Sequence, residues 1–152
     1  MILVLQRVTR AQVRVEGRCV GAIGKGLAVL AAVERGDGPE QSDWCARKVG
    51  EVRVFSDAEG RMNLSIRDAG GAVLAVSQFT LVGNLKKGTR PSYSDAAPPE
   101  EAKALFDDFV GRMRASGLNV ETGIFQAMME VELVNDGPVT LILRRPPNCH
   151  VE

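Results

Sequence analysis

The residues best placed to bind or transform a ligand form a short segment, Ser77-Gln78-Phe79-Thr80, which directly follows the apolar run 72–76. Hydroxyl and amide side chains at the point where a buried strand leaves the core can present hydrogen-bond donors and acceptors to a ligand. Ser and Thr at a strand end also satisfy their own backbone, and this structural explanation is the commoner one. The segment is therefore a candidate site only in combination with other features.

A second segment, Asn135-Asp136-Gly137-Pro138, separates two β-rich runs. Turn-forming residues between two such runs predict a β-hairpin. Proline at the start of a strand also fixes the backbone, and an X–Pro bond can be cis. A cis bond between Gly137 and Pro138 would turn two successive carbonyls to the same side, making a rigid acceptor site that contains no side chain.

A third candidate is the basic loop 86–91, in which Lys86, Lys87 and Arg90 are interrupted by glycine and proline. The loop lacks the G-x-x-x-x-G-K-[ST] pattern of a phosphate-cradling P-loop. Solvated loop charges explain it most simply, and contact with a nucleic-acid phosphate backbone is the second interpretation. The tail, with Arg144, Arg145 and His150, is expected to be a solvated terminus.

The scarce residue types exclude several kinds of chemistry. His150 is the only histidine, close to the end of the chain, so a Ser-His-Asp or Cys-His mechanism would depend on a terminal residue. Three widely spaced cysteines, Cys19, Cys45 and Cys149, form no C-x-x-C pair and do not predict a zinc site. An enzyme of this composition is expected to work without histidine, metal or cofactor.

The elements that must position these residues are predicted from periodicity. Valine-rich runs and tight turns predict strands through the first 33 residues. A helix is expected to carry Cys45, Val49 and Val52 on one face, and a second helix to follow Pro98 and to end at Gly117. Further strands are predicted over 51–55, 72–76, 119–123, 128–134 and 139–143. The expected class is α+β, mainly antiparallel sheet with two packed helices, as a single domain over residues 1–152.

Composition and charge limit the partners. Apolar residues make up 45% and charged residues 25% of the chain, and 19 basic residues balance 19 acidic ones. The net charge of zero therefore gives no indication of binding to a nucleic acid or a membrane, although a local basic patch can suffice for binding. No run reaches the roughly 18 apolar residues of a membrane span, and the first ten residues lack the pattern of a secretory signal. The expected location is the cytoplasm, with no membrane partner.

Three motifs taken together, SQFTL at 77–81, GTRPSY at 88–93 and NDGPVT at 135–140, resemble the D-aminoacyl-tRNA deacylase family. The resemblance runs from the first predicted strand to residue 143. It also includes Gln6-Arg7-Val8, Met62-Asn63-Leu64 and Thr122-Gly123-x-Phe125. Two features depart from the family's pattern, namely Gln126 where glycine is usual and a longer tail.

The resemblance implies a homodimeric hydrolase that cleaves the ester joining a D-amino acid, or mischarged glycine, to the acceptor end of tRNA. It implies a small barrel-like β structure whose active site lies at the subunit interface, where a Gly-cis-Pro unit from one subunit meets the SQ-x-x-T segment of the other. The implied catalytic residues are Ser77, Gln78 and Thr80, and we add Phe79, because backbone N–H groups around Phe79 and Thr80 are expected to stabilise the oxyanion. The implied substrate-binding residues are Gly137, Pro138 and Arg7, to which we add Phe125 and Met129. We add Lys86, Lys87 and Arg90 as the expected tRNA contacts.

Two other functions remain open on the sequence alone. A non-catalytic RNA-binding module is disfavoured by the neutral net charge, because dedicated RNA binding depends on basic surface. A related editor that removes L-alanine from mischarged tRNA would use the same scaffold with the opposite chiral preference. The backbone at Gly137-Pro138 and the products of hydrolysis distinguish these functions.

Overall fold

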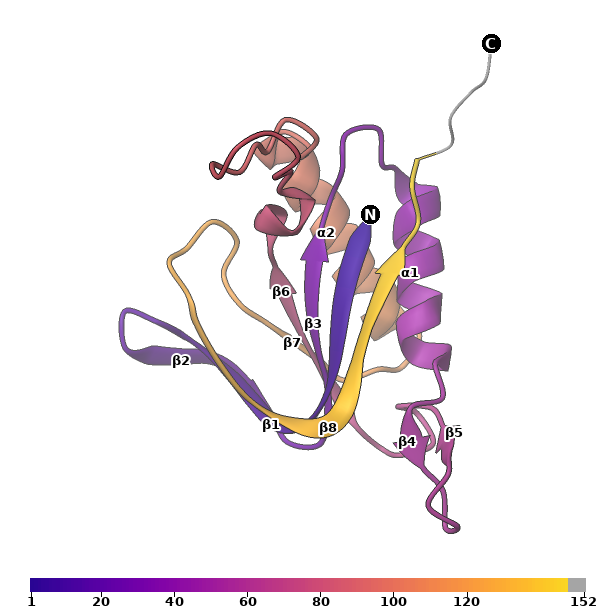
Figure 1. Cartoon of the computed structure of the whole chain (residues 1–152). Helices are drawn as coiled ribbons and strands as arrows, with labels where there is room; N and C mark the ends of the chain where they lie inside the picture. Colours follow the sequence, from indigo (N-terminus) through magenta and orange to yellow (C-terminus); the bar gives the residue numbers. More distant parts are fainter. Residues whose placement is uncertain (148–152) are drawn as a thin grey trace.

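The computed structural model describes residues 1–147 and contains one strongly curved six-stranded sheet with two helices packed against it (Figure 1). The strands of this sheet are β1 (Ile2–Val15), β2 (Arg18–Ile23), β3 (Gly26–Ala32), β6 (Ala72–Ser77), β7 (Val120–Thr122) and β8 (Glu130–Arg144). A separate two-stranded ribbon pairs β4 (Phe55–Ser56) with β5 (Met62–Leu64). The sheet is nearly closed into a barrel, so the expected α+β barrel-like class is confirmed.

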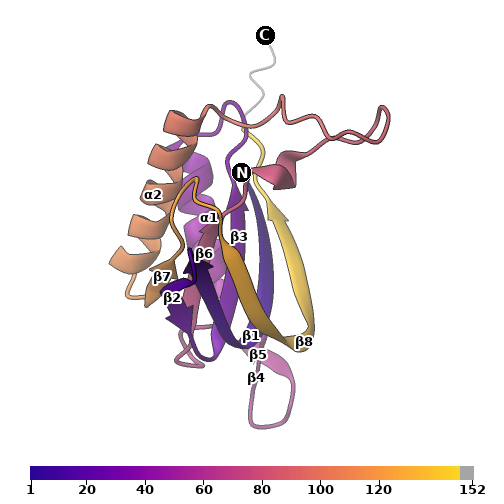
Figure 2. The ribbon, with the colours of Figure 1, turned by 90° about the vertical axis from the view of Figure 1, so that its left-hand side faces the viewer.

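The long strand β1 organises the sheet. It pairs antiparallel with β2, β3 and β8, whereas β3 and β7 both flank β6 in parallel. The two parallel pairs need long crossover connections, and each is supplied by a helix. These helices are α1 (Pro39–Glu51) and α2 (Pro99–Ala115), and they lie side by side on one face of the sheet (Figure 2).

Strand β3 is buried on both faces, which explains its unbroken apolar sequence. Leu27 and Val29 pack into the core cluster that contains the helices. Ala28, between them, points to the opposite face and packs with Val8 and Leu74 in a second cluster inside the curved sheet. The barrel interior and the helix layer are therefore two cores that share one central strand.

Gly21 brings the two ends of the curved sheet together. A Cβ atom added to Gly21 would lie 2.5 Å from the carbonyl oxygen of Thr122 on β7. Only glycine therefore allows this approach of β2 to β7. The near-closure of the sheet depends on a residue without a side chain at this position.

Both helices lie where the sequence predicts them, but Val52, expected on the first helix, is the C-cap residue that follows α1. In α1 the N3 residue Gln41 accepts a hydrogen bond from the Gly38 N–H at 2.9 Å, and Cys45 and Val49 are buried. In α2 the apolar stripe, including Phe106 and Phe109, is buried against the sheet, and the chain leaves the helix at Gly117 with φ of 91°. The strand predicted over 51–55 is wrong, because α1 continues through Glu51 and pairing begins only at Phe55.

The predicted hairpin at 135–138 is also wrong. Residues on both sides of this segment pair with the same strand, Gln6 with Thr140 and Val8 with Asn135. The chain therefore does not reverse. Residues 136–139 leave the ladder as a bulge in one long, bent strand β8, and the turn-forming residues serve the bulge rather than a hairpin (Figure 1). The length of β1 explains this outcome, because a 14-residue strand offers partners to both halves of β8.

Neither described helix is both long enough and apolar enough to cross a membrane.

Candidate active site

A cavity of about 960 Å³ opens where β6 leaves the sheet. One wall is the end of β6 and the short 3₁₀ helix η1 (Phe79–Val82), another is the start of α2, and a third is the segment 125–129. Six of the predicted catalytic and substrate-binding residues lie together in its lining. They are Ser77, Gln78, Phe79, Thr80, Phe125 and Met129.

The wall formed by η1 begins where sheet pairing stops. The Gln78 N–H donates to the Ala31 carbonyl at 2.8 Å, and the chain then turns so that the Gly83 N–H reaches the Thr80 carbonyl at 3.0 Å. As the first residues of this turn, Phe79 and Thr80 have N–H groups without acceptors inside it. The Gln78 side-chain amide donates to the Thr80 hydroxyl. The wall therefore offers backbone N–H groups, an amide and a hydroxyl at the edge of an apolar cavity.

The segment 123–129 forms the facing wall. A Cβ atom on Gly123 would lie 2.5 Å from the Met129 sulfur, so glycine here lets the loop pack closely. Gln126 has a φ of 63°, the left-handed region that favours glycine. Residue 126 therefore has the backbone conformation that favours glycine, although its side chain departs from the pattern of the family that the sequence resembles. Gln126 also lines the cavity.

The Gly137-Pro138 unit lies in the β8 bulge, and its peptide bond is cis. Arg7, only 9% exposed, binds Asp136, the residue that precedes the Gly137-Pro138 unit. Its Nε donates to the Asp136 carbonyl at 3.1 Å, and its Nη1 donates to the Val54 carbonyl at 2.6 Å. Asn135 adds amide donations to the carbonyls of Arg7 and Val139. The side chains of Arg7 and Asn135 thus fix the bulge. Their hydrogen bonds do not use the carbonyls of Gly137 and Pro138.

The remaining predicted site residues do not join the cavity within this chain. Arg7, Gly137 and Pro138 are absent from its lining, as are Lys86, Lys87 and Arg90. The three basic residues lie on the exposed loop between η1 and α2 that projects from the molecule (Figure 2). Lys86 instead lines a second, more open hollow of about 550 Å³ beside Arg144. His150 and Cys149 lie outside the described residues.

Sequence reasoning missed two cavity residues, Arg35 and Tyr93. The Tyr93 ring meets the Phe79 ring edge-on, with centroids 5.2 Å apart, and so supports the η1 wall. A signal for both existed in the sequence. Tyr93 ends the GTRPSY motif, and Arg35 is the second residue after the apolar run 27–33, near a strand end as Ser77 is after the run 72–76.

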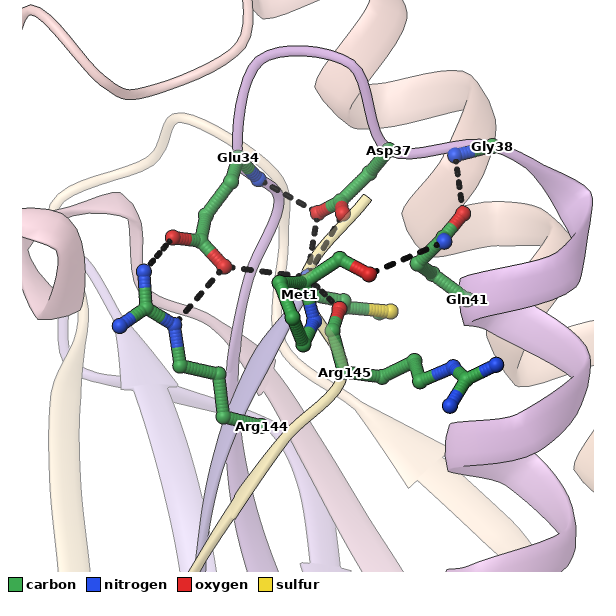
Figure 3. A network of polar contacts seen from close by, with 8 residues as sticks. Met1, Glu34, Asp37, Gly38, Gln41, Arg144 and Arg145 are labelled. Atoms are coloured by element: carbon green, nitrogen blue, oxygen red, sulfur yellow. Dashed lines mark hydrogen bonds and ion pairs between the residues drawn. The ribbon is translucent and has the colours of Figure 1, made fainter. Parts of the chain in front are cut away.

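An ionic network centred on the buried amino group of Met1 and the buried Glu34 fixes the chain next to the cavity (Figure 3). The amino group of Met1 donates to the Glu34 carboxylate at 3.2 Å, to Asp37 at 2.7 Å and to the Arg145 carbonyl at 2.7 Å. Arg144 donates to the other oxygen of Glu34 at 2.6 Å. Burial by itself raises the pKa of Glu34, but the bonds from Arg144 and the amino group outweigh it and lower the pKa below its usual value.

Other reactive groups of the described chain are not arranged as a catalytic centre. Burial raises the pKa of the Cys45 thiol to about 11, so this cysteine is protonated and unreactive at neutral pH. Among residues 1–147, no three His, Cys, Asp or Glu side chains gather as a metal site would need. The η1 wall of the cavity thus contributes N–H, amide and hydroxyl groups to the candidate site.

Comparison with known proteins identifies the family. The family model for D-Tyr-tRNA(Tyr) deacylase matches residues 4–144. A D-aminoacyl-tRNA deacylase of Geotalea uraniireducens (strain Rf4) is 56% identical over 148 residues, covering 97% of this chain and 96% of that protein. A D-aminoacyl-tRNA deacylase of Pelobacter propionicus is 57% identical over 145 residues, covering 95% of this chain and 100% of that protein.

Two solved structures share the fold. The c-Myc DNA Unwinding Element Binding Protein superposes with a TM-score of 0.91 at 38% identity, covering 96% of this chain and 99% of that chain. A probable eukaryotic D-amino acid tRNA deacylase gives a TM-score of 0.79 at 18% identity, covering 93% and 97%.

The chain belongs to the D-Tyr-tRNA(Tyr) deacylase family. The resemblance drawn from the three motifs is confirmed, and with it the expectation of a hydrolase that acts on the ester bond of aminoacyl-tRNA.

Proposed function

We propose that this protein is a homodimer that hydrolyses D-aminoacyl-tRNA and glycyl-tRNA, with the Gly137-Pro138 unit of one subunit completing the cavity of the other. The observation that carries this proposal is the separation of the two halves of the site. The cavity holds Ser77 to Thr80, while the bulge anchored by Arg7 lies outside the lining of that cavity. A second copy of the chain can supply the missing wall.

The free edge of β8 supports such a dimer. Within residues 1–147 this strand pairs only with β1, so its other edge is unpaired. Apolar side chains along it are exposed, with Ile142 at 73%, Val134 at 39% and Leu141 at 37%. An unpaired strand edge with exposed apolar residues is a typical surface for association. The bulge with Gly137-Pro138 lies between these residues and is carried into any interface they form.

A steric clash is a suitable way to reject L-aminoacyl-tRNA while D-aminoacyl-tRNA is accepted. Contacts that differ by a methylene discriminate by only about 1–3 kcal/mol, too little against abundant L-aminoacyl-tRNA. In our proposal the Gly137 and Pro138 carbonyls accept hydrogen bonds from the substrate's α-ammonium while the ester carbonyl sits at Thr80. A D residue then directs its side chain to solvent, and an L residue directs it into the backbone wall. Glycine passes because it has no side chain to collide.

Catalysis is assigned to positioning and charge stabilisation. A threonine hydroxyl needs a base to attack an ester, but the partner of the Thr80 hydroxyl within residues 1–147 is the Gln78 amide, which donates a hydrogen bond to it. We therefore assign the N–H groups of Phe79 and Thr80, aided by Gln78, to the oxyanion of the tetrahedral intermediate. The free 2′-hydroxyl of the terminal ribose activates the attacking water in this scheme.

The basic loop is proposed to contact the tRNA. Lys86, Lys87 and Arg90 are exposed and have no ion-pair partner among the described residues. Phosphate contacts of this kind add affinity that weakens as salt concentration rises. Few such contacts suffice for an enzyme that binds mainly the acceptor end.

Subunit mixing tests the shared site. Gln78→Ala damages the η1 wall, and Gly137→Ala damages the bulge, so each variant alone should be inactive. Co-expressed with distinguishable tags, half of the dimers are mixed and each has one intact site, which restores about a quarter of the wild-type activity. Mixed dimers as inactive as the parents would refute the interface site, since a site within one chain gains nothing from mixing.

A further inference from the structure

Arg35 is the only charged residue among those that line the cavity in the described part of the chain. The rest of the lining is apolar, aromatic or neutral polar, which suits a nucleoside and an aminoacyl group. A single guanidinium at the edge of such a cavity has no counterpart in the ester itself, whose α-ammonium is also positive. Its charge therefore calls for an anion elsewhere on the substrate.

Hydrogen bonds fix the backbone and the Nε of Arg35 and leave the end of its guanidinium available to a ligand. Its backbone N–H donates to the Asp95 carbonyl at 2.9 Å, and its Nε donates to the Ser94 carbonyl at 2.7 Å. No carboxylate of residues 1–147 lies within ion-pair distance of the guanidinium. The two Nη groups, which form the fork that recognises phosphate and carboxylate groups, thus remain available.

Two of the three neighbouring acids, Glu34 and Asp37, are engaged elsewhere, and the carboxylate of the third, Asp95, forms no ion pair with Arg35. Glu34, directly before Arg35, is neutralised by the Met1 amino group and Arg144, and Asp37 pairs with the same amino group (Figure 3). These bonds also anchor both ends of the short turn that carries Arg35. The turn therefore presents one uncompensated positive charge from a fixed backbone.

We propose that Arg35 binds the phosphodiester on the 5′ side of the terminal nucleoside of the acceptor strand. This assignment rests on the proposed function, because it takes the cavity to hold the terminal nucleoside and its aminoacyl ester. The first anion met on leaving that nucleoside is its 5′ phosphate. Arg35 is then a binding residue that fixes the position of the ester and takes no part in the chemical step.

Two substrates separate this role from others. D-tyrosyl-tRNA contains the phosphodiester, and D-tyrosyl-adenosine carries the same ester without any phosphate. We expect Arg35→Gln to lower kcat/KM on D-tyrosyl-tRNA by about 10- to 100-fold, mainly through KM, because a charge-assisted bond is lost. On D-tyrosyl-adenosine the variant should match the wild type within about three-fold. Arg35→Lys should recover part of the loss, because it restores the charge without the fork.

The salt dependence and a matched control complete the test. For Arg35→Gln the slope of log(kcat/KM) against log salt should be smaller by about 0.7, the value for one single-strand phosphate contact. Arg61→Gln removes an equal charge from the distant β4–β5 ribbon and should leave both substrates unaffected. Equal losses on both substrates, or no loss on D-tyrosyl-tRNA, would overturn the phosphate assignment. A wild-type protein inactive on both substrates would overturn the deacylase function itself.

Discussion

Arg7 on β1 holds Asp136 in the bulge of β8, with its Nε 3.1 Å from both the carbonyl and the carboxylate of that residue. The same guanidinium reaches across to the Val54 carbonyl, so one buried side chain joins the bulge to the loop after α1. The bulge is the part of the molecule that we propose to enter a partner's cavity. Arg7 therefore fixes the shape of the exposed bulge although its own side chain is buried.

Replacing Arg7 should damage activity more than stability. Arg7→Ala leaves the buried Val54 carbonyl and the partly buried Asp136 carbonyl without this donor, which costs about 1–3 kcal/mol in unfolding free energy. It also frees the segment 136–138, and we expect kcat/KM on D-aminoacyl-tRNA to fall by about 100-fold or more. Denaturant unfolding and single-turnover hydrolysis measure the two effects. Arg10→Ala, on the same strand but 61% exposed, is the control and should change neither quantity.

Gly137 should tolerate no side chain. A Cβ atom there would lie 3.1 Å from the Asn135 side-chain oxygen, and it would also stand on the proposed wall where the substrate Cα passes. Gly137→Ala should therefore abolish hydrolysis of D-aminoacyl-tRNA while the protein stays folded. Gly24→Ala is the matched control, since no atom lies within 4 Å of its added Cβ. Unchanged activity of Gly137→Ala would refute the backbone-wall model.

The Thr80 hydroxyl should be dispensable. The scheme assigns the oxyanion to backbone N–H groups, so Thr80→Ala should retain kcat within about ten-fold of the wild type. A nucleophilic threonine would instead show a loss of about 10⁴-fold or more, together with a covalent acyl-enzyme. Rapid-quench kinetics followed by mass spectrometry of the protein distinguishes the two results.

Stability should fall in acid through Glu34. Its pKa is lowered in the folded state, so its contribution is complete above the unfolded value of 4.5 and is lost as pH falls through the folded pKa. Glu34→Gln should lower the unfolding free energy at pH 7 by about 1–3 kcal/mol. The difference between variant and wild type should shrink below pH 4.5 in pH-dependent denaturation. A difference that stays constant with pH would contradict the ionic role of Glu34.

Local patterns predicted the local elements well. The prolines and acids before α2, its apolar stripe and Gly117 each act within a few residues, so the sequence contains all that they need. The bulge at 136–139 escaped prediction because its conformation depends on β1, more than 120 residues away, pairing with both halves of β8. Turn residues are equally compatible with a hairpin and with a bulge.

The site was predicted unevenly for the same reason. Ser77 to Thr80, which directly follow a buried strand, and Phe125, which ends the motif Thr122-Gly123-x-Phe125, were predicted and line the cavity, as does the predicted Met129. Arg35 was missed because its importance comes from the loop 94–97, which packs beside it and leaves it as the single charge at the cavity. Isolated charges of this kind become visible only when the lining is assembled in three dimensions.

Hydrolysis of matched D-tyrosyl-, L-tyrosyl- and glycyl-tRNA by the purified protein, with a chelator present, tests the central claim most directly. The account predicts rapid release of D-tyrosine and glycine, with the L ester cleaved at least about 100-fold more slowly. Hydrolysis of the L ester at a similar rate would contradict the chiral wall and favour an editor of L-aminoacyl-tRNA. Tight tRNA binding without any hydrolysis would contradict the enzyme and favour a binding module.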